Sequence, residues 1–174
     1  GRFWRTQPIA AGARADWPGN LYAQGLIWKR YQKVCRIARE IDADTPDAQV
    51  HDLRINCKKL RYLIEFFAPL FPSAEVKTVL KPLKRLQDNL GLFNDFSVQQ
   101  AALRSFMEGR ASNAPSRDDL SAAQSIGALI AVLARQQTEE RARVMANFAH
   151  FDSEGVRDTC RDLFHTPERE DRAP

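Results

Sequence analysis

The stretch HDLRINCKKLRYLIEFF, residues 51–67, combines two patterns that a single helix can display. At about 100° per residue, one face collects the apolar side chains of Val50, Leu53, Cys57, Leu60, Ile64 and Phe67. The neighbouring face collects His51, Arg54, Lys58 and Arg61, with Tyr62 beside them. The stretch therefore predicts a helix with one face in a core and a basic stripe next to that face.

Helical periodicity also marks the segments on either side of this stretch. Residues 20–41 are expected to form a first helix, in which Asn20 can cap the amino end. After a turn, the second helix is expected over residues 46–68, because Pro69 and Pro72 prevent it from continuing. The quoted stretch thus lies in the second helix of the chain.

A third helix is expected from Ser73, a good N-cap residue, to about residue 108. Pro82 and Gly91 lie inside its apolar pattern, so we expect one long bent helix, with two shorter helices as the alternative. This helix has a second basic stripe, formed by Lys77, Lys81 and Lys84.

A Gly-, Pro- and Ser-rich loop precedes a fourth helix over about residues 117–149. Its apolar pattern extends from Leu120 to Ala134 and includes, later, Val144, Met145 and Phe148. The second half, residues 135–151, has balanced charge and is expected to be solvated. A short capping helix is expected around residues 153–164. No segment alternates strictly between apolar and polar residues, so no sheet is predicted.

These elements predict an all-α fold, an up-and-down four-helix bundle with long helices and a short C-terminal capping helix. The bundle is expected to span residues 20–165. Residues 1–19 are expected to be an irregular lead-in and residues 166–174 a disordered tail.

The composition is ordinary for a soluble globular domain, with 174 residues, 44% hydrophobic and 28% charged. No apolar run approaches the roughly 20 residues needed to cross a bilayer, and the start of the chain lacks the apolar segment of a signal peptide. Cys35, Cys57 and Cys160 are odd in number and far apart, so buried free thiols and a cytoplasmic location are expected.

The positive charge is concentrated in one part of the sequence. The whole chain has a net charge of +4, whereas residues 51–85 contain eight Lys and Arg against three acids. Consecutive helices joined by a short loop usually pack antiparallel, so the two basic stripes can line one groove. Such a groove suits an extended polyanion such as a chain of phosphates, although a solvated basic face is the plainer interpretation.

The candidate binding residues are the basic residues of the second and third helices together with one tyrosine of the second helix. They are His51, Arg54, Lys58, Lys59, Arg61, Tyr62, Lys77, Lys81, Lys84 and Arg85. Three amides, Asn56, Gln87 and Asn94, fall on apolar faces, where pairing that fixes the register of the helices is expected. Asp88 and Asp95 are either partners that orient the basic side chains or surface acids.

Motifs of enzymatic sites are missing from the sequence, including GxxxxGK[ST], GxGxxG, HExxH and GxSxG. The other histidines, His150 and His165, have no ligand spacing to His51. We therefore expect a binding protein, with no catalytic residue, no cofactor and no metal.

The segments HDLRINCKKLRYLIEFFAPLF and LKRLQDNLGLFNDFSV resemble the CHAD domain, a conserved-histidine α-helical domain built from two similar four-helix bundles. The first family pattern, H-x-x-R-x-x-x-K/R-x-x-R, matches His51, Arg54, Lys58 and Arg61. The second, L-Q-x-x-L-G-x-x-N-D, matches Leu86, Gln87, Leu90, Gly91, Asn94 and Asp95. The resemblance extends from about residue 20 to 165 and is closest to the C-terminal half of such a domain.

This resemblance implies that the chain binds inorganic polyphosphate in a basic groove without catalysis, with Gln87, Asn94 and Asp95 behind the basic residues. It also implies a cytoplasmic location, with polyphosphate granules as a target, and an N-terminal half or a second copy as a partner. A nucleic-acid-binding domain is the first alternative, although Tyr62 is the one obvious aromatic for base stacking. A protein-interaction bundle with an acidic partner is the second; no membrane partner is expected.

Overall fold

The structure is a computed structural model that describes residues 18–166. The described residues contain five α-helices, and a 3₁₀ turn, Ala68–Leu70, follows the second of them. The helices are α1 (Pro18–Arg39), α2 (Asp47–Phe67), α3 (Ser73–Gly109), α4 (Arg117–Phe151) and α5 (Glu154–Phe164). No strand occurs between residues 18 and 166. The all-α prediction is confirmed, and the predicted helix ends are correct to about two residues.

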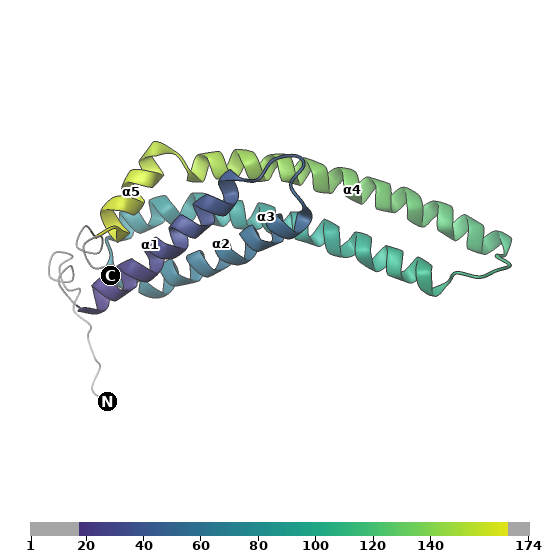
Figure 1. Ribbon diagram of the computed structural model, residues 1–174, viewed down its shortest axis with the longest axis horizontal. Coiled ribbons are helices and arrows are strands. Elements are labelled where there is room, and N and C mark those ends of the chain that lie inside the picture. Colours follow the sequence, from purple (N-terminus) through teal and green to yellow (C-terminus); the bar gives the residue numbers. More distant parts are fainter. Residues whose placement is uncertain (1–17, 167–174) are drawn as a thin grey trace, which may run out of the picture.

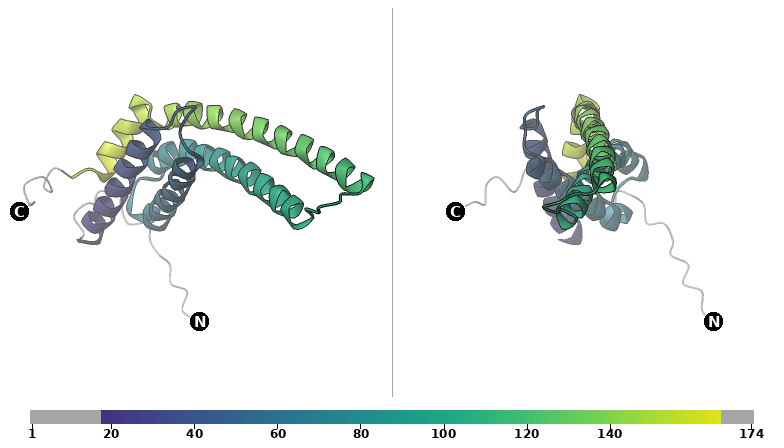
Figure 2. Two further views of the ribbon diagram at one scale, coloured as in Figure 1. Left: turned by 45° about the vertical axis from the view of Figure 1, so that its right-hand side comes forward. Right: turned by 90° about the vertical axis from the view of Figure 1, so that its right-hand side faces the viewer.

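Two parts of the fold differ in how many helices they contain. At one end α2 packs against both α1 and α3, and α5 closes the bundle by packing against α1 and α3. At the other end α3 and α4 run on side by side beyond the ends of α1 and α2 (Figures 1 and 2). We use the name hairpin for residues 94–143, and the name bundle for the other described residues.

The core of the molecule lies in the bundle. Its apolar cluster takes residues from α1, α2 and α5, but it ends at Phe93 on α3 and begins again at Val144 on α4. The predicted core face of α2 is confirmed by a set of residues that are buried in this cluster: Val50, Leu53, Cys57, Leu60 and Ile64. Phe67 is partly buried against them.

The third helix is continuous. α3 runs from Ser73 to Gly109 through both Pro82 and Gly91, so the prediction of one long helix is confirmed and the alternative of two shorter helices is wrong. Pro82 lacks a backbone N–H and removes one hydrogen bond of the helix, and the packing of Val79, Leu83 and Leu86 in the core compensates for that loss.

Two predicted caps are wrong. α1 begins at Pro18, so Asn20 lies inside the first turn and is buried rather than exposed at the helix end. Pro72 occupies the cap position of α3, and Ser73 is its first helical residue. Serine caps do occur elsewhere, because Ser116 accepts from the backbone N–H of Asp119 at α4.

Burial along α4 agrees only in part with the prediction: Leu133, Val144 and Phe148 of the apolar pattern are buried, but other positions differ. Leu120 in the apolar first half is 54% exposed, and Leu129 and Val132 are also exposed. In the second half, expected to be solvated, Val144, Phe148 and Phe151 are buried in the core. The reason is the number of neighbours, since the first half has only α3 beside it and the second half reaches the bundle.

A layer of polar side chains separates the core from the hairpin. Asn89 Nδ2 donates to Glu140 Oε2 at 2.6 Å, and Asn147 Nδ2 donates to Asn89 Oδ1 at 3.0 Å. Farther along α3, within the hairpin, Gln100 Nε2 donates to Gln137 Oε1 at 2.7 Å. Glu140 is 5% exposed, so the expectation that it lies on a solvated face is wrong.

All three cysteines are buried free thiols, as predicted. Burial raises the pKa of Cys35 to about 11 and that of Cys160 to about 12, and it raises the pKa of Cys57 as well. The thiols therefore stay protonated at neutral pH. The predicted lead-in up to residue 17 and tail from residue 167 lie outside the described residues. None of the helices in residues 18–166 combines the length and the apolar character needed to cross a membrane.

Candidate polyanion-binding site

The basic stripe of α2 lies on the side of this helix that faces α3. Arg61 Nη1 donates to Gln87 Oε1 of α3 at 3.2 Å, and the ring of His51 lies 5.7 Å from that of Phe93. Arg54 and α3 together line a hollow of about 470 Å³, whose lining residues are Arg54, Gln87, Asp88, Gly91, Leu92 and Asp95. The two sequence patterns, far apart in the chain, are thus brought to one surface.

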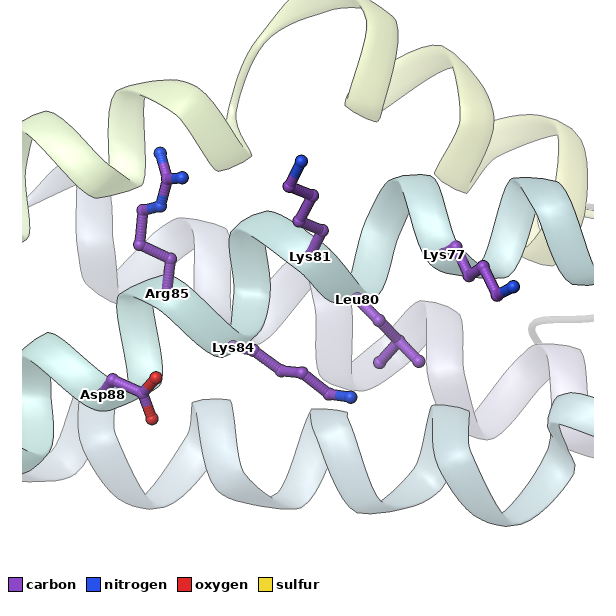
Figure 3. A pocket seen from close by; sticks show the side chains of 6 residues that line it. All are labelled: Lys77, Leu80, Lys81, Lys84, Arg85 and Asp88. Atoms are coloured by element: carbon purple, nitrogen blue, oxygen red, sulfur yellow. The ribbon is translucent and has the colours of Figure 1, made fainter.

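The lysines of α3 line a second hollow of about 570 Å³, and its lining residues are Lys77, Leu80, Lys81, Lys84, Arg85 and Asp88 (Figure 3). Lys81 and Arg85 point toward α4 and α5, whereas Lys84 points toward α2. Asp88 lines both hollows, so they adjoin along α3. We refer to them together as the α2–α3 hollows.

One carboxylate of the protein, that of Glu65, already contacts two cations of this surface. Glu65 Oε1 accepts from Arg61 Nε at 3.0 Å and lies 3.6 Å from Lys84 Nζ. The hydrogen bond from Arg61, together with the charges of Arg61 and Lys84, lowers the pKa of the Glu65 carboxyl. Two of the candidate cations are therefore partly neutralised by the protein itself.

The amides on the apolar faces have different surroundings. Asn56 is buried, accepts from Arg30 Nη1 at 2.8 Å and donates to Asp52 Oδ1 at 3.1 Å, which ties α2 to α1 as the predicted register pairing requires. Gln87 is bonded to Arg61 and so orients it. Asn94 is half-buried, and Asp95 is exposed in the hollow beside Arg54.

The remaining candidates lie at the margins of this surface. Lys58 and Tyr62 are exposed on α2, with the Lys58 ammonium 5.7 Å from the tyrosine ring. Lys59 is also exposed, and its position on the helical wheel turns it away from α3 toward the solvent side of α2. Lys77 lies at the end of the α3 row that is farthest from Asp88.

No pattern in the sequence pointed to Arg141 of α4, which contacts the start of α2. Its guanidinium lies 5.4 Å from the ring of Phe93, the same ring that His51 contacts. It also donates to the backbone carbonyl of Thr45 and forms an ion pair with Asp47. The charge of Arg141 is paired within the protein, so this residue is a structural link between α4 and the first turn of α2.

The fold and this surface define a helical bundle in which two consecutive helices present cations around adjoining hollows. The sequence model of the CHAD domain family matches residues 3–104, more than half of the chain, and the chain belongs to this family. Within the described residues the match includes α1, α2 and most of α3, hence every candidate residue; α4 and α5 follow it. No curated protein matches the sequence.

Proposed function

We propose that this chain is a non-catalytic module that binds inorganic polyphosphate along the α2–α3 hollows. The observation that supports the proposal is the grouping of Lys77, Lys81, Lys84 and Arg85 around one hollow that has a single acid, Asp88, in its lining. Lysine and arginine at successive turns of a helix lie about 5–6 Å apart, a spacing that suits repeated contacts with a chain of phosphates.

The proposed binding is multivalent charge pairing. Arg54, Lys58 and Arg61 meet the polymer from the α2 side, where arginine supplies bidentate contacts and lysine point charges. Binding to Arg61 and Lys84 replaces their contacts with Glu65. Each neutralised phosphate releases condensed counterions, so the affinity decreases steeply as the salt concentration rises.

The module has no catalytic role in this proposal, and it acts by attaching a protein to polyphosphate. A cytoplasmic location, with polyphosphate granules as the target, follows from that role. Membership of the CHAD domain family supports a function related to polyphosphate.

Single-stranded nucleic acid is the second candidate. The observation in its favour is the exposed ring of Tyr62 next to Lys58, with Phe66 exposed one turn further along α2. An aromatic ring beside a cation is the arrangement on which unpaired bases stack. The polyphosphate proposal is favoured because the α3 side of the hollows has lysines and an arginine and no aromatic side chain.

The test is a titration of the chain with long-chain polyphosphate, single-stranded RNA and duplex DNA, each at two salt concentrations. Polyphosphate is expected to bind most tightly at both concentrations. Equal or tighter binding of RNA would overturn the preference. Binding of none of the three would favour an acidic protein partner instead.

A matched pair of variants locates the binding surface. The double variant Lys81→Ala/Arg85→Ala is expected to weaken binding of long-chain polyphosphate by about tenfold. Arg104→Ala/Arg117→Ala removes two exposed cations of the hairpin and is expected to leave the affinity within about twofold. Equal losses in the two variants would mean that net charge, rather than the α2–α3 hollows, determines binding.

A further inference from the structure

A second basic hollow lies on the other side of α2, against α1. Its volume is about 790 Å³, and its lining residues are Leu26, Lys29, Arg30, Gln32, Lys33, Arg36 and Leu63. Four of these are cations, and none of the lining residues in the described part of the chain is a carboxylate. We refer to it as the α1 hollow.

The cations of the α1 hollow form an ordered row. Lys29, Lys33 and Arg36 follow one another at spacings of four and three residues, so they lie along one face of α1 over two turns. All three are exposed. Among the residues that the structure describes, none of them has an ion pair with an acid.

The fourth cation is held in position. Arg30 is half-buried, and its Nη1 donates to Oδ1 of Asn56 at 2.8 Å. Asn56 is 2% exposed and is itself bonded to Asp52, so the acceptor is fixed. A guanidinium has five N–H donors, and this bond uses one of them at the wall of the hollow.

The α1 hollow differs from the α2–α3 hollows in its electrostatics. In the α2–α3 hollows Asp88 lines the surface and Glu65 contacts Arg61 and Lys84. Among the described residues, the lining of the α1 hollow contains no such competitor. An anion can therefore enter it without displacing a carboxylate of the protein.

The two surfaces lie on opposite flanks of α2, which packs against α1 on one side and α3 on the other. On the exposed face of α2 between them, Lys59 lies toward α1 and Lys58 toward α3 on the helical wheel. A helix with its side chains is about 10–12 Å across, so a ligand must extend at least about that far to cross from one flank of α2 to the other.

We propose that the α1 hollow is a second anion-binding site, which takes a further stretch of the polyphosphate chain bound by the α2–α3 hollows. Lys58 and Lys59 contact the polymer where it crosses α2. A short phosphate occupies one flank at a time, whereas a long chain occupies both, so the protein selects long polymers. This inference rests on the proposed function for the identity of the ligand.

The test uses calorimetric titration of the full chain with inorganic triphosphate and with long-chain polyphosphate. The triple variant Lys29→Gln/Lys33→Gln/Arg36→Gln is expected to lose one class of triphosphate site. It is also expected to weaken long-chain binding by about tenfold, with a salt slope smaller by about one for each lost cation. The control, Arg104→Gln/Arg117→Gln/Arg135→Gln, removes the same charge from the hairpin.

The outcomes separate this inference from the proposed function. If the triple variant keeps its long-chain affinity within about twofold while Lys81→Ala/Arg85→Ala loses it, the α1 site is overturned and the α2–α3 site stands. Loss in the triple variant alone would place the polymer in the α1 hollow and overturn both the α2–α3 site and the proposed crossing of α2. Equal losses in the triple variant and its control overturn the inference. Circular dichroism verifies that each variant keeps its helicity, since every substituted side chain is exposed.

Discussion

The two halves of α3 lie in different surroundings, although both belong to one unbroken helix. Up to Phe93 the apolar side chains of α3 enter the core between α2 and α5, and beyond it the helix has only α4 beside it. In α4 the order is the opposite, because its residues enter the core only from Val144 onward. Burial thus depends on how many helices surround a position, and an apolar stripe by itself does not secure it.

The hairpin leaves a set of large apolar side chains exposed, which in the described residues comprises Val98, Phe106, Leu120, Leu129 and Val132. Its two helices are joined by polar bonds such as the one between Gln100 and Gln137, and a capping box of Ser116 and Asp119 begins α4. Few buried apolar contacts give a region a low local stability. We therefore expect the hairpin to open more readily than the bundle.

The largest expected effect compares one leucine from each region. Leu86 is 0% exposed in the bundle and Leu129 is 47% exposed in the hairpin. Leu86→Ala is expected to lower the free energy of unfolding by about 2–5 kcal/mol, and Leu129→Ala by no more than about 0.5 kcal/mol. Chemical denaturation measures both. Similar losses in the two variants would show that the hairpin is packed as tightly as the bundle.

The next effect concerns the polar layer where the two regions meet. Glu140→Ala removes the buried carboxylate acceptor of Asn89 and is expected to cost about 1–3 kcal/mol, because the amide keeps only its bond to the backbone carbonyl of residue 140. Glu139→Ala is the control, since the Glu139 carboxylate is exposed and, among the described residues, pairs with Arg135 alone; a change within about 0.5 kcal/mol is expected. A neutral Glu140→Ala variant would mean that water replaces the lost acceptor.

This comparison also explains which parts of the fold the sequence predicts. The core face from Val50 to Ile64 was predictable because periodicity identifies the side of a helix that is apolar. The exposure of Leu120 was not, because periodicity does not say whether a third helix lies beside that side. Asn89, the buried partner of Glu140, lies 51 positions away in the chain, and no local pattern reports a contact over such a separation.

The candidate site also has parts that the sequence predicts and parts that it does not. The row of His51, Arg54, Lys58 and Arg61 follows from helical spacing, and its place beside α3 follows from a short connection between antiparallel helices. The α1 hollow could not be predicted, because α1 has basic residues on several faces and only the contact with Leu63 and Asn56 of α2 selects one. The same applies to Arg141, whose partners lie in the α1–α2 loop and at the start of α2.

A smaller effect is expected at two glycines inside helices, one in each region. A Cβ at Gly91 or at Gly127 would meet nothing within 4 Å, so alanine fits without strain and restricts the unfolded chain. Each substitution is expected to add about 0.4–1 kcal/mol of stability. For Gly91→Ala the gain should appear in global unfolding, and for Gly127→Ala in hydrogen-exchange protection of the hairpin.

The same pair tests the binding surface, because Gly91 lines the hollow beside Arg54 and Gly127 lies in the hairpin. Gly91→Ala is expected to weaken polyphosphate binding by a few fold if the polymer approaches the backbone there, and Gly127→Ala to leave it unchanged. Unchanged binding in both variants would place the polymer along the lysines of α3, away from Gly91.

The smallest effect on stability is expected at two matched ion pairs, Arg61–Glu65 in the bundle and Arg135–Glu139 in the hairpin, each spanning four residues. Pairs that solvent can reach contribute about 0–1 kcal/mol, and Glu65→Gln in the half-buried pair and Glu139→Gln in the exposed pair are each expected to cost no more than that. Because folding lowers the pKa of Glu65, its contribution is complete above the ordinary glutamate pKa of about 4.3. It decreases as the pH falls below that value.

Thermal unfolding between pH 3 and pH 7 measures this dependence, and the difference in stability between wild type and Glu65→Gln should shrink toward pH 3.

The two variants, Glu65→Gln and Glu139→Gln, should differ more in binding than in stability. Glu65→Gln frees Arg61 and Lys84 at the α2–α3 hollows, so polyphosphate is expected to bind several-fold more tightly. Glu139→Gln changes the net charge equally, and an equal gain there would mean that overall charge alone controls the affinity.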